Sequence, residues 1–166
     1  MTVVYAGIGS RETPFEVLRL MSRIARACAA EGAVLRSGAA DGADAAFERG
    51  AVEGGGGTEI YLPWRRFNGH ASPLFHVSRE ALELAARFHP AWARCSPAAQ
   101  KLHARNGYQV LGRHLDAPAD VVICWTPGGS GSGGTGQAIR IARAHGVPVH
   151  DLGNAEVLAR YIERLG

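Results

Sequence analysis

A glycine-rich segment in the C-terminal third of the chain constrains the fold more than any other feature. It follows Val121–Trp125, a short apolar run rich in β-branched residues and typical of a buried parallel strand. Residues 128–136 read GGSGSGGTG, and from Thr135 or Gly136 onward the apolar spacing becomes helical. A strand, a glycine loop and a helix in this order direct backbone N–H groups toward an anion, usually a phosphate. A flexible linker would share the composition, but the adjoining strand and helix favour an anion-binding loop.

Composition indicates a globular protein with extra glycine in its loops. Hydrophobic residues make up 46% of the 166 residues, charged residues 20%, and 22 residues are glycine. A chain of this length can bury a real core, so we expect one domain spanning residues 1–166. The net charge of +3 is too small to indicate a nucleic-acid partner by itself.

The cysteine and histidine patterns favour a reduced, cytoplasmic protein without a metal. The three cysteines are widely spaced and form no C-x-x-C pair. The seven histidines show neither an H-x-x-x-H motif nor a close His/Cys spacing, so we expect no metal site and no cofactor. No signal peptide is evident at the N-terminus, and no stretch approaches the ~20 apolar residues of a membrane span.

Strands and helices are predicted to alternate along the chain. Besides the run at 121–125, four segments have the pattern of buried strands: Thr2–Ala6, Ala33–Arg36, Glu59–Leu62 and Val147–Leu152. A capping box at Thr13 to Glu16 and an N-cap at Asn154 predict helix starts, whereas residues 65–95 are the least legible part of the sequence. Strands alternating with helices predict an α/β, Rossmann-like three-layer sandwich with a mainly parallel sheet of about five strands.

Three polar or glycine-rich loops follow predicted strands, at Gly7–Arg11, Ser37–Asp44 and Pro127–Thr135. In parallel sheets, ligands bind beyond the carboxyl ends of the strands, near the point where the strand order reverses. We therefore expect the three loops to form one pocket. The first loop reads GIGSRE, which is not the dinucleotide-binding fingerprint, and no Walker lysine is present to indicate ATP hydrolysis.

The order of these motifs resembles the SLOG superfamily, which includes the cytokinin-activating LOG phosphoribohydrolases and the DNA-processing protein A (DprA) family. YAGIGSRETP, LRSGAADGADAAFERGA and EIYLPW are similar to the DprA-like half. LHARN, ADVVICWTPGG and GGTGQA resemble the LOG pattern MHxRK, strand, PGGxGTxxE. The chain looks most like the small YspA- and YpsA-related members of bacteria and phages. The resemblance covers most of the chain except about 65–95 and implies a Rossmann-like nucleotide-binding domain.

The resemblance also implies site residues. Together with Gly9 and Asp41, which are candidates from their places in the loops, the candidate nucleotide- and phosphate-binding residues are Gly7, Ser10, Arg11, Ser37, Gly38, Gly128, Gly129, Gly133, Gly134 and Thr135. Arg105 matches the arginine of the LOG active site, although a cation near a helix end would also be explained by the helix dipole.

The catalytic glutamate of LOG enzymes falls on Ala138 in this sequence, preceded by Gln137. N-glycoside cleavage needs a carboxylate to assist an oxocarbenium-like transition state or to position water, and alanine cannot supply one. Asp41, Asp44 and Glu12 are candidate replacements, and Asp41 could equally be a helix N-cap. The predicted catalytic residues are therefore Arg105, Asp44 and Gln137.

Two functional hypotheses follow. In the first, the protein binds a nucleotide or nucleotide derivative, as a sensor or as a LOG-like phosphoribohydrolase that cleaves a nucleoside monophosphate. In the second, like DprA, it binds single-stranded nucleic acid without catalysis, with Arg36, Arg65 and Arg66 as candidate phosphate contacts. The resemblance also implies a homodimer, and nothing in the sequence indicates a membrane partner.

Overall fold

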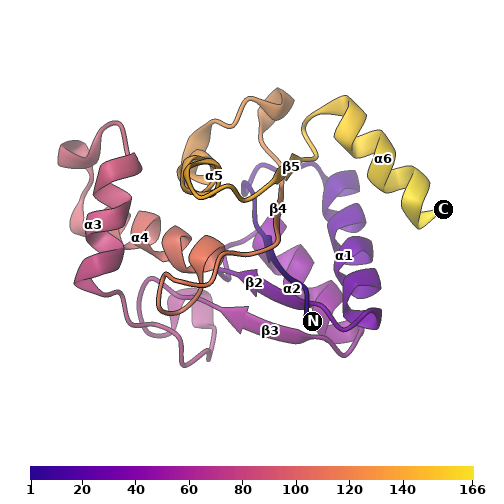
Figure 1. The fold of residues 1–166 in the computed structure, drawn as a ribbon, viewed down its shortest axis with the longest axis horizontal. Coiled ribbons are helices and arrows are strands. Elements are labelled where there is room, and N and C mark those ends of the chain that lie inside the picture. Colours follow the sequence, from indigo (N-terminus) through magenta and orange to yellow (C-terminus); the bar gives the residue numbers. More distant parts are fainter.

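The computed structural model describes residues 1–166 and contains one five-stranded, all-parallel sheet (Figure 1). The strand order is β3-β2-β1-β4-β5. The strands are β1 (Val4–Gly7), β2 (Val34–Ser37), β3 (Gly57–Ile60), β4 (Val121–Cys124) and β5 (Val149–Asp151). All five predicted strands are present, each within a few residues of its expected bounds, and the prediction of a Rossmann-like sandwich is confirmed.

Six α-helices cover the two faces of the sheet (Figure 1). They are α1 (Phe15–Ala30), α2 (Ala43–Glu53), α3 (Arg79–Phe88), α4 (Pro97–Leu111), α5 (Gly133–Ala144) and α6 (Ala155–Leu165). Three short 3₁₀ helices connect them: η1 (Phe67–Gly69), η2 (Trp92–Arg94) and η3 (Pro127–Gly129). Helices α1, α2 and α6 pack on one face, and α4 and α5 pack on the other with α3 outside them. No helix combines the length and apolarity needed to span a bilayer.

Alternation along the strands explains the two cores. In β1, Tyr5 packs with Leu35 and Ile123 against α1 and α2. Its neighbour Ala6 belongs to the opposite core, with Val122 and the apolar residues of α4 and α5. Because successive side chains of a strand point to opposite faces, a run that is apolar at every position has to be covered on both sides.

Of the two helix starts predicted from capping residues, the structure confirms the cap at Asn154 and not the one at Thr13. Asn154 Oδ1 accepts hydrogen bonds from the N–H groups of Glu156 and Val157, as expected of an N-cap. The predicted capping box at Thr13 is wrong: α1 starts without a side-chain cap, and the Thr13 hydroxyl instead donates to the Ser10 carbonyl at 2.6 Å. This hydrogen bond stabilises the conformation of the loop after β1.

Helices α1 and α2 approach so closely that only glycine fits at position 50. A Cβ placed on Gly50 would lie 2.1 Å from the Ser22 carbonyl oxygen, which belongs to the backbone of α1 and cannot move aside cheaply. The Ser22 hydroxyl donates to the Ala46 carbonyl at 2.9 Å and holds the two helices together beside this contact.

We expect Gly50→Ala to lower the free energy of unfolding by about 1–3 kcal/mol, since overpacking forces the two helices apart. Urea denaturation followed by circular dichroism measures the change. Gly134→Ala is the matched control, because a Cβ at that helical position meets no atom within 4 Å. Equal stability of the two variants would contradict the close packing.

Candidate functional site

A cavity of about 590 Å³ opens at the carboxyl ends of β1 and β4, where the strand order reverses. Loops that follow β1, β2 and β4 meet there, as the sequence predicted, and α4 closes the remaining side. The cavity is lined by Ile8, Gly9, Ser10, Arg11, Glu12, Ala40, Asp41, Asp44, Phe67, Asn68, Ala99, Leu102, His103, Arg105, Asn106, Gln109, Pro127, Ser132, Gly133, Gly134 and Thr135.

The glycine-rich loop has a defined shape and is anchored at its base. Thr126 donates both its N–H, at 2.9 Å, and its hydroxyl to the Asp151 carboxylate at the end of β5. The same hydroxyl oxygen accepts the N–H of Gly131 at 2.9 Å. A Cβ on Gly136 would lie 2.3 Å from the Gly131 carbonyl oxygen, so glycine is required where the loop folds back on α5. These contacts give the segment one defined shape, which a flexible linker lacks.

Helix α5 begins at Gly133, two or three residues earlier than the sequence indicated, and its first turn faces the cavity. Its N-cap residue, Ser132, makes no side-chain capping bond. The first N–H groups of a helix have no partner within the helix and carry partial positive charge. The wall formed by Ser132 to Thr135 therefore presents donors for an anion.

Arg105 forms the floor of the cavity. It is buried in the middle of α4, which continues past Gly107 to Leu111, so the interpretation of Arg105 as a helix-end cation is wrong. One guanidinium nitrogen donates to the Gly38 carbonyl and, at 3.5 Å, to the Tyr61 carbonyl. Its Nε has no partner. A buried donor without a partner is costly, which indicates that a ligand or water satisfies it.

Asp44, in the first turn of α2, is the buried carboxylate of the site. One of its oxygens accepts the N–H of Ala40 at 3.2 Å. Burial raises its pKa to about 6, although the positive charge of Arg105 and the N–H groups of Ala40 and Gly9 partly oppose the rise. This carboxyl therefore exchanges a proton near pH 6.

Most of the predicted site residues line the cavity. Those that do are Gly9, Ser10, Arg11, Asp41, Asp44, Arg105, Gly133, Gly134 and Thr135. Asp41 makes no capping bond to α2, whose N-cap is Gly42, so the alternative of a helix cap is excluded for it. Gly7, Ser37, Gly38, Gly128, Gly129 and Gln137 do not line the cavity.

Ser37, Gly38 and Gly129, which lie outside the cavity, have structural roles. The Ser37 hydroxyl donates to the Gly7 carbonyl at 2.6 Å, which ties β2 to β1. Gly38 leaves room for Arg105, since a Cβ there would lie 2.5 Å from the guanidinium. Gly129 packs against Asn154 with a φ of +70°, a conformation suited to glycine. These positions shape the site without facing it.

Gln137 points away from the cavity toward α3. Its amide donates to the Ala85 carbonyl at 2.9 Å and accepts from Arg140 at 2.9 Å, and the side chain is fully buried. The structure thus gives no support to the predicted catalytic role of Gln137. Ala138 is also fully buried, in the core with the α4 and α5 residues, so α5 supplies no carboxylate to the cavity.

Several lining residues were missed by sequence reasoning. Leu102, Asn106 and Gln109 share the cavity-facing side of α4 with Arg105, at spacings of three and four residues. That helical spacing was a usable signal. Phe67 and Asn68 lie in residues 65–95, where the sequence shows no pattern that would have identified them as site residues. The Phe67 ring lies under the Arg105 guanidinium, with the guanidinium carbon 5.5 Å from the ring centroid.

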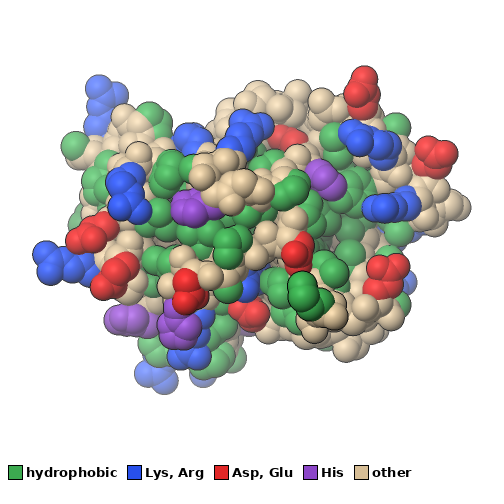
Figure 2. All heavy atoms as spheres, viewed as in Figure 1, with side chains coloured by type: hydrophobic (Ala, Val, Ile, Leu, Met, Phe, Trp, Pro, Cys, Tyr) green, Lys and Arg blue, Asp and Glu red, His purple; other side chains and the backbone are tan.

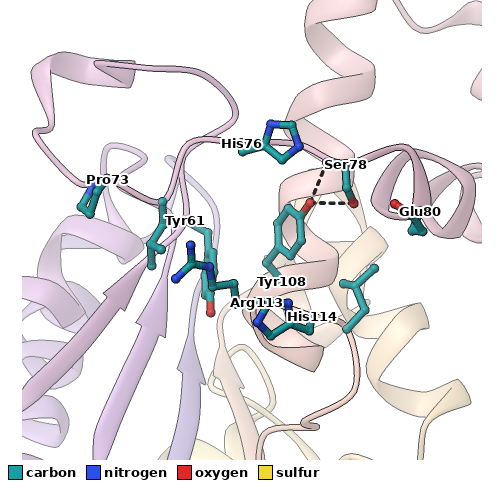
Figure 3. Close-up of a pocket in the computed structure, with 10 residues that line it drawn as sticks. Tyr61, Pro73, His76, Ser78, Glu80, Tyr108, Arg113 and His114 are labelled. Carbon is teal, nitrogen blue, oxygen red and sulfur yellow. Dashed lines mark hydrogen bonds between the residues drawn. The ribbon is translucent and has the colours of Figure 1, made fainter.

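A second cavity of about 430 Å³ is lined by Tyr61, which follows β3, and by residues at and after the C-terminal end of α4 (Figure 3). The Tyr61 and Tyr108 rings are stacked there, with centroids 5.5 Å apart. The Tyr108 hydroxyl donates to the Ser78 hydroxyl at 3.0 Å and accepts the Ser78 N–H at 2.8 Å. None of the predicted site residues lines this cavity.

The fold is a Rossmann-like sandwich with a cavity at the point where the strand order reverses. Comparison with solved structures confirms the fold. The Moco carrier protein of Chlamydomonas rheinhardtii matches with a TM-score of 0.59 and 16% identity over 99% of this chain and 85% of that protein. The structural genomics target TM1055 matches with a TM-score of 0.54 and 22% identity, over 90% and 72% of the two chains.

DNA processing protein A from Streptococcus pneumoniae also matches, with a TM-score of 0.58 and 17% identity. The match covers 99% of this chain and 56% of that protein. At these identities the similarity shows a common fold. The sequence matches no protein-family model and no curated protein.

We expect Asp44 to make stability depend on pH. The folded chain holds a proton on Asp44 up to about pH 6, whereas an unfolded chain releases it near 3.8. The folded state thus binds more protons between these values, and the free energy of unfolding should fall as pH rises through this window. Asp44→Asn should flatten the fall, as measured by denaturation at a series of pH values.

The matched control for this experiment is Asp116→Asn, which changes an exposed aspartate outside the cavity. It should leave the pH profile of the wild-type protein unchanged. A profile of Asp44→Asn identical to that of the wild type would show that the buried carboxyl keeps an ordinary pKa.

Proposed function

We propose that this protein binds a nucleotide or nucleotide derivative, with its phosphate at the N-terminus of α5. One observation carries the proposal: the uncapped first turn of α5 and the buried Arg105, whose Nε has no partner, line the same cavity. Two independent groups that can donate hydrogen bonds to an anion thus belong to the lining of one cavity. Exposed Arg11 lies on its rim and supplies a second cation.

The remainder of the lining fits a sugar and a base. Three carboxylates, of Glu12, Asp41 and Asp44, lie along the cavity and can accept hydrogen bonds from ribose hydroxyls. Phe67 offers an aromatic surface and Asn68 both a donor and an acceptor. A ligand with an anionic group, hydroxyl groups and a flat ring would use all of these.

Two of the structural neighbours are named for what they handle, a carrier protein for Moco and a DNA processing protein. Their names support ligand binding in general by proteins of this fold. The DNA-binding hypothesis has less support from this chain. Arg36 is buried, donates to the Ala117 carbonyl at 2.6 Å and pairs with Glu59 at 3.3 Å, so it is unavailable to a phosphate.

Arg65 and Arg66 are exposed and remain the basic residues of that hypothesis. On the face shown in Figure 2, basic and acidic side chains are interspersed and form no continuous basic surface. Binding of single-stranded nucleic acid would weaken steeply with salt, because each phosphate contact releases counterions. Nearly salt-insensitive binding of a mononucleotide would favour the proposed function.

Calorimetric titration with AMP tests the proposal. We expect saturable binding that Arg11→Ala weakens by roughly ten- to a hundredfold, since a hydrogen bond to a charged group contributes about 1.5–3 kcal/mol. Arg19→Ala is the matched control, because Arg19 is exposed on α1 and does not line the cavity. Equal effects of the two variants, or no binding of any of several nucleoside monophosphates, would contradict the proposal.

N-glycoside cleavage is the second candidate function, favoured by the proton exchange of Asp44 near pH 6 inside the cavity. In this reaction water adds to the anomeric carbon and the base leaves with a proton. Incubation with nucleoside monophosphates, NAD and ADP-ribose should then release free base. Asp44→Asn should lower the rate at least about 100-fold.

For this second candidate, Arg19→Ala again serves as the control and should release base at the wild-type rate. Binding without base release from any of the compounds would leave a binding protein or sensor.

A further inference from the structure

Three side chains of types that can bind a metal ion, His89, Cys95 and His103, lie together at the edge of the cavity. His89 follows α3, Cys95 follows η2, and His103 lies within α4. One ligand atom from each lies within 4.8 Å of the other two, and all three residues are half-buried. The Cys95 sulfur is 3.8 and 3.9 Å from the two ring nitrogens of His89, whose ring centroid is 4.3 Å from that of His103.

We propose that His89, Cys95 and His103 bind a zinc ion. One thiolate and two imidazoles are a donor set that suits Zn²⁺ and leaves a fourth tetrahedral position for water or another ligand. Mg²⁺ and Ca²⁺ prefer oxygen donors, and none of the three residues offers a carboxylate. The proposal is independent of what the main cavity binds.

The metal-free cluster is held by weak interactions that an ion could replace. The Cys95 thiol donates to the Ala91 carbonyl over 3.6 Å, and His89 Nδ1 accepts the Ala91 N–H at 3.0 Å. Binding would deprotonate the thiol, form a zinc–sulfur bond and release one proton to solvent. Ligation through His89 Nδ1 would give up one backbone hydrogen bond, a small cost against three metal bonds.

The ion would connect the segment after α3 to α4, the helix on which Arg105 lies. Neither η2 nor the positions on either side of it contain a fully buried residue, so little apolar packing fixes this segment. His103 itself lines the cavity, two residues before Arg105 on α4. Zinc at this site would therefore restrain the α3–α4 connection and, through it, the orientation of α4.

This proposal departs from the expectation drawn from the sequence. We expected no metal site because the histidines lack close spacing, a criterion suited to ligands within one turn or hairpin. Here the ligands lie six and eight residues apart along HPAWARC and CSPAAQKLH, and the fold of η2 against α4 brings them together.

Titration of the reduced, chelator-treated full chain with Co²⁺ as a spectroscopic probe tests the site. We expect one equivalent to bind, with the visible bands of tetrahedral cobalt, a thiolate-to-cobalt charge-transfer band in the near ultraviolet and release of one proton. Zn²⁺ should displace the Co²⁺. Cys95→Ser should abolish the charge-transfer band and weaken zinc binding by at least about 100-fold, since changes behind the ligands alone cost 10–100-fold.

Cys28→Ser is the matched control, because Cys28 is half-buried on α1, away from the cluster, and should leave the spectrum unchanged. His89→Ala should also weaken zinc binding, and it provides a second test should Cys95→Ser fold poorly. Absence of one saturable equivalent of Co²⁺, or a charge-transfer band that survives Cys95→Ser, would overturn the proposal.

Discussion

The reversal of strand order between β1 and β4 is the constraint on which the site depends. From β1 the chain adds β2 and then β3 on one side, and after α3 and α4 it returns to place β4 on the other side of β1. Helix α1 leaves β1 toward one face of the sheet and α5 leaves β4 toward the opposite face. The loops after these two neighbouring strands diverge, and the space between them cannot be filled by either helix.

Burial of two opposite charges in that space gives the cavity its chemical character. Burial lowers the pKa of Arg105 and raises that of Asp44, and each charge partly offsets the effect on the other. No ion pair within 4 Å joins them. Two buried atoms on α4, Arg105 Nε and Gln109 Oε1, also lack partners. A buried donor or acceptor without a hydrogen-bond partner destabilises the fold by about 1–3 kcal/mol, and a ligand that bonds to it would remove this penalty.

The sequence was sufficient for features set by local pattern. The β-branched runs predicted the strands, and the polar loops after three of them predicted the edge where the cavity lies. The start of α5 was predicted to within three residues. Each of these depends on residues adjacent in the chain, so a single sequence carries the information.

Features set by distant contacts could not be predicted in this way. Arg105 was expected near a helix end, yet α4 continues through Gly107, which lies beside Leu84 of α3, to Leu111. Gln137 was expected to face the ligand because it precedes the position of the LOG glutamate, but a neighbour along a helix points about 100° away. It therefore reaches α3 and Arg140 instead.

The distribution of charge within the cavity limits what can bind. Arg11, Arg105 and the first turn of α5 contribute positive potential to the lining, and Glu12, Asp41 and Asp44 contribute carboxylates. A polyanion would be attracted by the first set and repelled by the second. A small molecule with one phosphate and several hydroxyls satisfies both, and a cavity of about 590 Å³ lies in the range of sites for such ligands. Since position 138 is alanine, α5 supplies no carboxylate, and the three carboxylates of the lining lie in the loop after β1, the loop after β2 and the first turn of α2.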